Sequence, residues 1–491
     1  MAIQLLKRFP ELVRLKPWPL LFSCYSNDAS ESEVVTSVVS ILTHQRSKSR
    51  WNTLRSACPN GIEAFEFSQI SFHLKNKPQL ALRFFHWTQS NSLCHHNLSS
   101  YSSIIHLLAR ARLTSHAYHV IRTAIRDSHL NDDDDDESCC YMSPPLNLFR
   151  TLVKTYRDSG SAPFVFDLLI KACLDSNKVD PSIEIIRMLL SRGISPKVST
   201  LNSLISRVCR SRGVDAGYAI YREVFRLDEQ KEEISKRGSG FRVAPNVHTY
   251  NSLMLCCYQE DLVEKVEEIW HEMVEMGCKP NAHSYSVLMA AFWEEGRVGD
   301  ADRLWVEMRN EEIEPDVVSY NTMIGGFCKI GDVGRAEDFF REMALAGIDS
   351  TASTYEHLVK GYCNIGDVDS AVLVYKDMTR RDLRPDASTL DVMIRLLCGK
   401  GKVQEALEFE RYAVGKFDLL PKEKSYEALI KGLCLEGRME EALNLQAEMV
   451  GKGFQPNSEV YGAFIDGYIR RGNKELAGAL RKEMLQTQMQ S

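Results

Sequence analysis

The chain has 491 residues, of which 44% are hydrophobic and 26% are charged, and its formal net charge at pH 7 is −6. This composition is typical of an ordered protein and excludes a chain that is disordered along its whole length. No apolar run approaches the roughly eighteen residues that a membrane-spanning helix needs, so the sequence predicts no membrane span.

The N-terminal segment has the properties of an organelle transit peptide. Its first 27 residues contain four basic residues against one acid, Glu11, and several apolar residues among them fall on one side of a possible helix. We therefore predict a transit peptide at residues 1–30, with a disordered basic tail as the alternative. Leucine and arginine dominate over serine and threonine, which favours the mitochondrion over the chloroplast.

Two regions separate this segment from the rest of the chain. Residues 31–97 are predicted to be helical, and residues 98–162 to hold degenerate copies of the repeat described below. Five consecutive aspartates followed by Glu137 interrupt these copies. Neighbouring charges on a flexible segment cannot hold a rigid ligand geometry, so residues 131–137 are predicted to be a solvated, disordered insertion rather than a metal site.

A period of 35 or 36 residues governs the last two hundred residues. Three residue types recur at this spacing, with one methionine missing: Gly296, Gly331, Gly366, Gly401, Gly437 and Gly472; Ala301, Ala336, Ala371, Ala406, Ala442 and Ala477; and Met273, Met308, Met343, Met378, Met449 and Met484. A fixed period of this length is typical of a solenoid built from stacked supersecondary units.

One period, residues 317–351, indicates how each unit folds. Apolar residues from Tyr320 to Cys328 have the spacing of one helical face, and a second amphipathic stretch follows. Gly331 between them ends the first helix, because glycine adopts the left-handed conformation at no steric cost. A single hairpin cannot bury its apolar face, so the sequence predicts an all-α, right-handed superhelical solenoid of helix–turn–helix repeats.

The period resembles the pentatricopeptide repeat in its length of 35 residues, in its opening Tyr320-Asn321-Thr322 and in its turn from Cys328 to Gly331. The resemblance implies the class of this family that contains plain repeats, of the plant organellar type, with about nine repeats over residues 163–491. The second repeat carries fourteen extra residues, in a polar stretch around 227–241. The repeats begin at Pro163, Val198, Val247, Ala282, Val317, Ala352, Ala387, Glu423 and Ser458.

The cysteines are predicted to be reduced and structural. Five of the fourteen occupy the twelfth position of a repeat, on the buried side of its first helix: Cys209, Cys328, Cys363, Cys398 and Cys434. Free cysteine packs there as a small hydrophobe. No Cys-x-x-Cys spacing indicates zinc, and the pattern is not that of a secreted disulfide framework, so we predict no metal site.

The sequence contains no motif of a common active site. It has no phosphate-binding P-loop, no Gly-x-Ser-x-Gly elbow and no His-Glu-x-x-His helix. The chain ends inside a repeat, which leaves no room for an appended catalytic domain. We therefore expect no enzymatic activity, no cofactor and no small-molecule substrate.

The resemblance implies that the repeats bind single-stranded RNA at roughly one base per repeat. In the family the fifth and last residues of a repeat read the base and the second residue wedges between bases. The implied reading pairs are Asn202 with Asn246 and Asn251 with Asn281 for pyrimidines, Ser286 with Asp316 for guanine, and Asn321 with Thr351 for a weaker pyrimidine preference. The implied wedges are His248, His283 and Val318, although exposed histidines at such positions are as often plain surface.

Other repeats depart from this pattern because an acid stands at the fifth position. The pairs concerned are Asp167 with Lys197, Glu356 with Asp386, Asp391 with Lys422 and Glu427 with Asn457. An acid lies unfavourably close to an anionic strand. We expect these repeats to tolerate any base or to make no contact with RNA.

The first helices are expected to line a groove, because their positions 2, 5, 9 and 13 lie close to one face. Positions 9 and 13 supply seven cations predicted to contact the RNA backbone, against three acids: Lys171, Arg210, Lys329, Lys360, Arg395, Lys431 and Arg470. Residues 163–491 as a whole contain 42 Lys and Arg against 52 Asp and Glu. The groove would therefore concentrate the positive charge while acids occupy the outer helices; cations that merely solvate the first helices are the alternative.

Two hypotheses of function follow. The first is a sequence-specific binder of single-stranded organellar RNA that acts by occupying its site in RNA processing, stability, splicing or translation, with other RNA-processing proteins as further partners. The second is a protein–protein scaffold of the tetratricopeptide type, which the acidic repeat region favours. The period of 35 residues and the asparagines at the fifth position favour the RNA binder.

Overall fold

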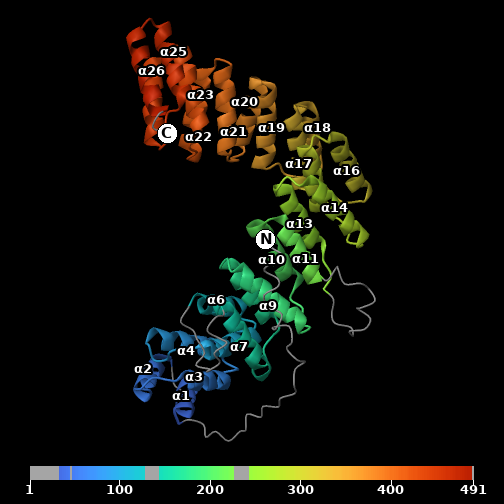
Figure 1. Cartoon of the computed structure of the whole chain (residues 1–491), viewed down its shortest axis with the longest axis vertical. Coiled ribbons are helices and arrows are strands. Elements are labelled where there is room, and N and C mark those ends of the chain that lie inside the picture. The colour runs from blue at the N-terminus through green and yellow to red at the C-terminus, as the bar shows by residue number, and fades with distance from the viewer. Residues whose placement is uncertain (1–32, 45–46, 128–142, 226–242, 489–491) are drawn as a thin grey trace. The chain divides into compact units, whose positions relative to one another are not determined.

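The computed structural model describes residues 33–44, 47–127, 143–225 and 243–488, and these form 25 helices and no strand (Figure 1). The predicted all-α repeat fold is confirmed. The predicted transit peptide (1–30), the acidic insertion (131–137) and the extra residues around 227–241 lie outside the described residues. No described helix is both long and apolar enough to cross a bilayer.

The chain divides into two compact modules, Met1–Thr200 and Leu201–Ser491, here called the N-terminal and the C-terminal module. The N-terminal module contains α1 (Glu33–His44), α2 (Ser47–Ala57), α3 (Ala64–His73), α4 (Pro78–Ser90), α5 (Leu98–Arg110), α6 (Thr114–Arg126), α7 (Pro144–Ser159), α8 (Phe164–Asp175) and α9 (Val179–Ser191). Helices α6 and α7 pack against α8. For this reason the repeat from Pro163 groups with the N-terminal helices and not with the later repeats.

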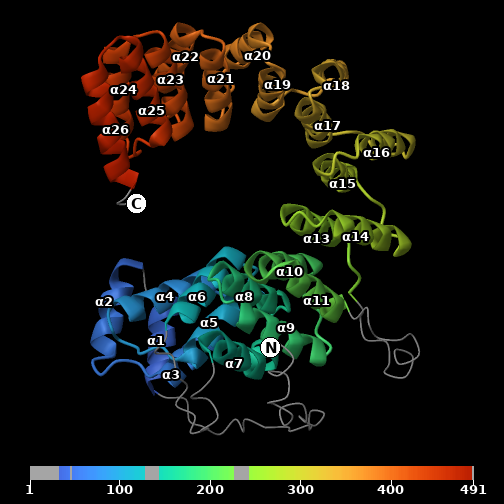
Figure 2. The same cartoon turned by 45° about the horizontal axis from the view of Figure 1, so that its top comes forward.

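The C-terminal module consists of helix pairs that follow one another along the chain (Figures 1 and 2). The first helices are α10 (Val198–Arg212), α13 (Val247–Gln259), α15 (Ala282–Glu294), α17 (Val317–Ile330), α19 (Ala352–Ile365), α21 (Ala387–Gly399), α23 (Glu423–Leu435) and α25 (Ser458–Arg470). The second helices are α11 (Val214–Phe225), α14 (Val263–Glu275), α16 (Val298–Asn310), α18 (Val333–Leu345), α20 (Val368–Arg380), α22 (Val403–Phe417), α24 (Met439–Gly451) and α26 (Lys474–Gln488). From α13 to α25 each first helix packs on the next first helix, so these helices form one continuous layer.

The residues of the period explain the shape of each pair. All six glycines from Gly296 to Gly472 have positive φ, between +70° and +84°, where a side chain would be strained. The alanines from Ala301 to Ala442 are completely buried between the two helices of a pair. Glycine therefore ends the first helix, and alanine allows the second helix to approach it.

A hydrogen bond repeats between the two helices of a pair. A buried tyrosine at the fourth position donates its hydroxyl to an acid 22 residues later: Tyr285 to Glu307 (3.2 Å), Tyr320 to Glu342 (3.4 Å), Tyr355 to Asp377 (2.8 Å) and Tyr426 to Glu448 (3.1 Å). Burial and the nearby carboxylate raise the pKa of Tyr355 to about 12. The hydroxyl therefore keeps its proton and remains a donor at physiological pH.

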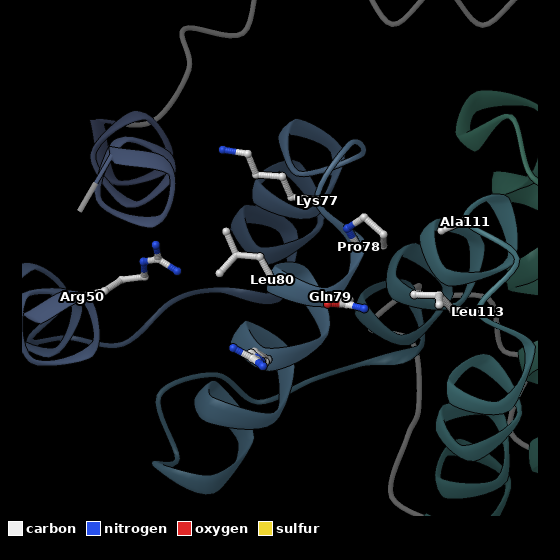
Figure 3. A pocket seen from close by; sticks show the side chains of 8 residues that line it. Arg50, Lys77, Pro78, Gln79, Leu80, Ala111 and Leu113 are labelled. Atoms are coloured by element: carbon white, nitrogen blue, oxygen red, sulfur yellow. The ribbon is translucent and has the colours of Figure 1, made fainter. Parts of the chain in front are cut away.

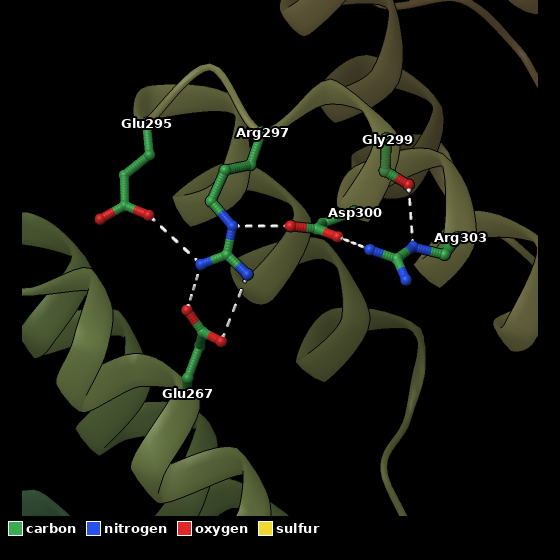
Figure 4. Close-up of polar contacts among 6 residues, drawn as sticks. All are labelled: Glu267, Glu295, Arg297, Gly299, Asp300 and Arg303. Carbon is green, nitrogen blue, oxygen red and sulfur yellow. Dashed lines mark hydrogen bonds and ion pairs between the residues drawn. The ribbon is translucent and has the colours of Figure 1, made fainter.

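Ion pairs connect neighbouring repeats on the outer helices. Arg297, which precedes α16, pairs with Glu267 of α14 and with Asp300 of its own helix, and the distance from Arg297 Nε to Asp300 Oδ2 is 2.7 Å (Figure 4). Asp300 also pairs with Arg303. Partly exposed pairs of this kind contribute little to stability, so packing must supply most of it.

Successive first helices approach closely where one of them carries a glycine at its tenth position. Gly326 on α17 faces the ring of Trp293 on α15, and Gly361 on α19 faces Cys328 on α17. A Cβ added to Gly326 would lie 2.1 Å from Trp293 Cδ2, and one added to Gly361 would lie 2.6 Å from Cys328 Sγ. At these two positions the twelfth residue of one repeat therefore fills the space that the glycine of the next repeat leaves.

The predicted packing of the twelfth-position cysteines is confirmed for four of the five. Cys209, Cys328, Cys363 and Cys434 are free and buried, whereas Cys398 is free and partly exposed. Desolvation by burial raises the pKa of Cys328 to about 12, so its thiol is protonated and unreactive at neutral pH.

Cys328→Ser should lower the free energy of unfolding by about 1–3 kcal/mol, because it buries a hydroxyl among apolar atoms. Cys398→Ser should have a smaller effect, since water already reaches that side chain. Urea unfolding of both variants measures the difference. Equal losses at the two positions would contradict the packing role of Cys328.

Candidate functional site

A groove of about 650 Å³ lies along the first helices α13, α15, α17 and α19. Positions 2, 5, 9 and 13 of α15 and α17 line it, as the helical spacing predicts, together with positions 2, 9 and 13 of α19 and position 9 of α13. At those positions it is lined by Leu255, His283, Ser286, Ala290, Glu294, Val318, Asn321, Gly325, Lys329, Ser353, Lys360 and Asn364. Below, "the groove" means this surface.

The structure brings the predicted base-reading residues together as four pairs. In three of them the fifth side chain donates to the last one: Asn202 Nδ2 to Asn246 Oδ1 (3.3 Å), Asn251 Nδ2 to Asn281 Oδ1 (3.1 Å) and Asn321 Nδ2 to Thr351 Oγ1 (3.3 Å). In the fourth pair the Ser319 hydroxyl lies 2.9 Å from Ser286 Oγ and 2.9 Å from Asp316 Oδ1. Each pair is thus one hydrogen-bonded unit.

The two members of a pair differ in accessibility. The fifth residues Asn251 and Ser286 are only 4% and 2% exposed, whereas the last residues Asn281 and Asp316 are exposed. Asn281 and Asp316 also cap the following first helix by accepting from a backbone N–H, at 3.0 and 2.9 Å. In these two pairs the fifth residue therefore forms the floor, and the last residue forms the rim.

The predicted wedge residues all lie at the surface. His248 and His283 are exposed, and Val318 is 48% exposed although it is apolar. His283 and Val318 line the groove on consecutive repeats. They are available to contact a flat ligand from the side.

The predicted backbone cations have different surroundings. Lys329 pairs with Glu294 of the preceding repeat, Lys360 lies 3.4 Å from Asp386, and Arg395 lies 3.2 Å from Asp391. Lys431 and Arg470 line a second hollow of about 260 Å³ together with Asp466. Arg210 is exposed, and Lys171 belongs to the N-terminal module, where its Nζ lies 5.9 Å from the centre of the Tyr118 ring.

The charge distribution agrees only in part with the expectation from the sequence. From α13 to α26 the second helices carry twelve Lys and Arg against 21 Asp and Glu, so the acids do lie on the outer layer. The first helices from α13 to α25 carry six Lys and Arg against seven Asp and Glu. Their layer is nearly neutral rather than positive, because acids such as Glu356, Asp391 and Glu427 offset its cations.

The acids at the fifth position are held by the protein itself. Asp167 accepts from the Lys197 backbone N–H at 2.9 Å, and Glu356 accepts from the Asp386 backbone N–H at the same distance. Glu427 accepts from Asn457 Nδ2 at 2.6 Å. Burial raises the pKa of both Glu356 and Glu427. Burial thus already disfavours the charged form of these two glutamates, and an anionic strand beside them would disfavour it further.

The N-terminal module has a basic pocket that the sequence analysis missed. Arg50 of α2 and Lys77 at the start of α4 extend into the same space beside Leu80 (Figure 3), and Arg83 lines it too. The pocket measures about 450 Å³, and no acid is among its lining residues. The described residues of this module contain eighteen Lys and Arg against nine Asp and Glu, in contrast to the acidic repeats.

A second feature missed from the sequence is a hydroxyl at the third position of the first helices. Thr249, Ser284, Ser319 and Thr354 are fully buried beside the reading pairs. Their spacing of 35 residues is the signal that could have revealed them. Within the described parts of the chain, no group of three or more His, Cys, Asp or Glu side chains is placed to hold a metal ion.

Comparison with known protein families gives one consistent match. The PPR repeat family matches residues 245–294, 287–329, 315–364, 350–399 and 421–468, and a single PPR repeat matches residues 459–487. The matched segments follow the helix pairs of the C-terminal module.

Relatives from Arabidopsis thaliana carry the same repeat in their names. One pentatricopeptide repeat-containing protein is 45% identical over 287 residues, which are 57% of this chain and 56% of the relative. A second, named mitochondrial, is 31% identical over 180 residues, which are 36% of this chain and 30% of the relative. The chain thus spans about half, or less, of these relatives' own lengths.

Comparison with solved structures matches the chain to two structures that contain bound RNA. The pentatricopeptide repeat protein PPR10 in complex with an 18-nt psaJ RNA element is 17% identical, with a TM-score of 0.42 over 92% of this chain and 74% of that chain. Yeast Rmd9p in complex with a 16-nt target RNA is 11% identical, with a TM-score of 0.32 over 86% of this chain and 93% of that chain.

Proposed function

Because the chain belongs to the PPR repeat family, we propose that it binds single-stranded RNA along its first helices and recognises about one base per repeat. The protein acts by occupancy rather than by catalysis: the bound stretch is shielded or kept unpaired, which steers RNA processing, stability, splicing or translation.

One observation supports this proposal most. In four consecutive repeats hydrogen bonds connect the fifth and last side chains, directly in three and through the Ser319 hydroxyl in the fourth, and two of these pairs contribute Ser286 and Asn321 to the groove. Short amide, hydroxyl and carboxylate groups can donate to and accept from the edge of a base. A peptide-binding scaffold has no need for one such pair at every repeat.

The pairs imply a short recognition sequence. In the order of the chain they favour pyrimidine, pyrimidine, guanine and, more weakly, pyrimidine, with the RNA running from 5′ to 3′. The repeats from Ala352 onward add little to the base preference. Their fifth residue is an acid, or it is Gly462, which has no side chain. Binding of the full chain to a random RNA pool, followed by sequencing of the retained RNA, tests this reading.

Enrichment of that pattern is the expected result. A pool that stays random, together with retention of peptides by the purified protein, would favour the tetratricopeptide-type scaffold instead. A mixed result, in which RNA is retained without any base preference, would keep RNA binding and reject base reading.

Lys329→Ala should weaken binding to all RNA sequences alike. Lys329 is exposed in the groove, and its partner Glu294 can be replaced by a phosphate. Loss of one phosphate contact should reduce the slope of log K against log salt by about 0.7. Fluorescence anisotropy with labelled RNA at several salt concentrations measures both effects.

Arg341→Ala is the matched control for Lys329→Ala. Arg341 lies on the second helix α18 and pairs with Asp338, with both side chains 68% exposed. Its removal should leave RNA affinity and the salt slope unchanged. A change of base preference in Lys329→Ala, or equal losses in the two variants, would contradict a phosphate contact at Lys329.

We propose an organellar location, and the mitochondrion in particular. The basic and apolar character of residues 1–30 supports it, and so does the relative that is named mitochondrial. Residues 1–60 fused to a fluorescent protein should direct it into mitochondria. Cytosolic fluorescence would refute the organellar location, and fluorescence in chloroplasts would select the alternative organelle.

A further inference from the structure

A hydroxyl from the next repeat reaches the short fifth side chains. In the C-terminal module the distances are 2.8 Å for Thr249 to Asn202, 2.7 Å for Ser284 to Asn251, 2.9 Å for Ser319 to Ser286, 2.6 Å for Thr354 to Asn321 and 3.0 Å for Ser425 to Asp391. All five hydroxyl residues stand at the third position of a first helix and are fully buried. The contact is therefore a property of the repeat and not of a single pair.

Two backbone N–H groups determine the direction of the hydrogen bonds around Asn251. The Ser284 N–H donates to Asn281 Oδ1 at 3.0 Å, and the Asn281 N–H donates to Ser284 Oγ at 3.1 Å. An N–H can only donate, so Asn281 must present its oxygen, and the Ser284 hydroxyl keeps its own proton, for which Asn251 Oδ1 at 2.7 Å and Asn281 Oδ1 at 2.9 Å are the two acceptors. Asn251 then turns Nδ2 toward Asn281 Oδ1 (3.1 Å) and Oδ1 toward the Ser284 hydroxyl (2.7 Å).

This orientation decides what Asn251 offers to a ligand. Its oxygen is turned to Ser284, and one of its two Nδ2 protons is used by Asn281. The remaining Nδ2 proton is a donor. A donor suits the O2 carbonyl, which cytosine and uracil share, and it therefore suits a preference for pyrimidines of either kind.

Among the repeats of the C-terminal module that are followed by another repeat, two lack the contact, and in both the fifth residue is the longer glutamate. Glu356 reaches the Asp386 backbone N–H instead, and no hydrogen bond joins it to the buried Thr389 hydroxyl of the next repeat. After Glu427 the third residue of the next repeat is Val460, which has no hydroxyl. The contact with a third-position hydroxyl thus occurs where the fifth side chain is short.

We infer that the third-position hydroxyl of one repeat orients the base-reading side chain of the repeat before it. Base preference then depends on three residues, the third of which lies in the following repeat. Ser284 is a positioning residue for Asn251, and Ser319 is one for Ser286. The inference rests on the proposed RNA-binding function and adds to it the element that fixes the donor–acceptor pattern.

Ser284→Ala tests the inference in the full chain by selection from a random RNA pool. Without the hydroxyl the Asn251 oxygen loses its donor, and only the hydrogen bond from Nδ2 to Asn281 Oδ1 still orients the amide. The preference for pyrimidine over purine at the base read by Asn251 should fall about three- to tenfold, the effect of one neutral hydrogen bond. The preference for guanine at the base read by Ser286, in the same repeat as Ser284, should stay unchanged.

Two controls separate positioning from a general structural role. Ser284→Thr keeps the hydroxyl, as Thr249 and Thr354 do in other repeats, and should restore the preference. Ser252→Ala removes a hydroxyl that bonds to the His248 carbonyl of its own helix at 2.7 Å, and it should not change any base preference. If Ser284→Ala weakened all sequences alike, its role would be structural and the inference overturned; a wild-type protein without any base preference would reject the proposed function itself.

A gain of preference provides an independent test. Glu427→Asn creates the pair Asn–Asn with Asn457, the same pair as in the repeat from Val247, but Val460 offers it no hydroxyl. The double variant Glu427→Asn with Val460→Thr supplies one at nearly the same volume. A pyrimidine preference at this position in the double variant and not in the single one supports the inference, and equal preference in both overturns it.

Discussion

Gly326→Ala should destabilise the C-terminal module by about 3 kcal/mol, the upper part of the range for an overpacked core. The added Cβ would lie 2.1 Å from Cδ2 and 2.2 Å from Cε2 of Trp293. Both atoms belong to the rigid ring of Trp293, a residue that is 4% exposed. The centre of this ring lies 4.8 Å from the centre of the Phe327 ring. Because the ring cannot move aside as a flexible side chain would, α15 and α17 must separate. Urea unfolding monitored by tryptophan fluorescence measures the loss.

Gly462→Ala is the matched control for this prediction. Gly462 also lies inside a first helix, α25, but an added Cβ would meet nothing within 4 Å. Alanine there removes the conformational freedom of glycine from the unfolded chain and should stabilise the protein by about 0.5–1 kcal/mol. Opposite signs are therefore expected from the same substitution. Equal destabilisation would show that the helix backbone, and not the contact with Trp293, requires glycine at position 326.

The local structure of each repeat could be predicted from the sequence because it depends on residues close together in the chain. Gly331 has the left-handed conformation expected of a helix end, with φ of +84°, and Ala336 is completely buried as a close helix approach requires. The first helices from α10 to α25 begin at the residues from which the period counts the repeats. A fixed period turns many weak local signals into one strong signal.

Contacts between repeats were harder to predict, because they depend on the distance and rotation between neighbouring helices. The recurring twelfth-position cysteines predict a buried position. They do not predict that the glycine of the next repeat packs against the cysteine, as Gly361 does against Cys328. The third-position hydroxyls recur in phase, yet their bonds to the preceding repeat, such as Ser284 to Asn251, appear only in three dimensions. The sequence thus predicts which repeat positions form the candidate site, but not the hydrogen bonds that connect them across repeats.

The N-terminal module shows where periodicity gives no help. The sequence predicts only that residues 31–97 are helical, and the described residues among them form four helices, α1 to α4. The pocket formed by Arg50 and Lys77 joins residues from different helices that no repeat relates. The charge of the first-helix layer was overestimated for another reason. The prediction considered the cations at positions 9 and 13, but acids at the fifth position, such as Asp391, lie in the same layer.

Ser286→Asn should change the base that the repeat from Ala282 recognises from guanine to uracil. The new amide has a precedent in the preceding repeat, where Asn251 lies between Ser284 and Asn281 at the equivalent position. By the same geometry the Ser319 hydroxyl would donate to the new oxygen, and the new Nδ2 would face Asp316. Asparagine followed by aspartate is the pairing that the family resemblance assigns to uracil. The expected discrimination is about 1–3 kcal/mol, the scale of a good base contact.

Ser286→Ala separates this switch from a simple loss of contact. Alanine removes the Ser286 hydroxyl without offering an amide, so the preference for guanine should weaken while no preference for uracil appears. In both variants the bases read by Asn251 and Asn321 should keep their preferences, because those pairs have hydroxyl partners of their own in Ser284 and Thr354. If Ser286→Asn instead lowered the affinity for every sequence equally, the pairs would not read bases, and a scaffold that binds protein would explain the acidic repeats better than an RNA binder.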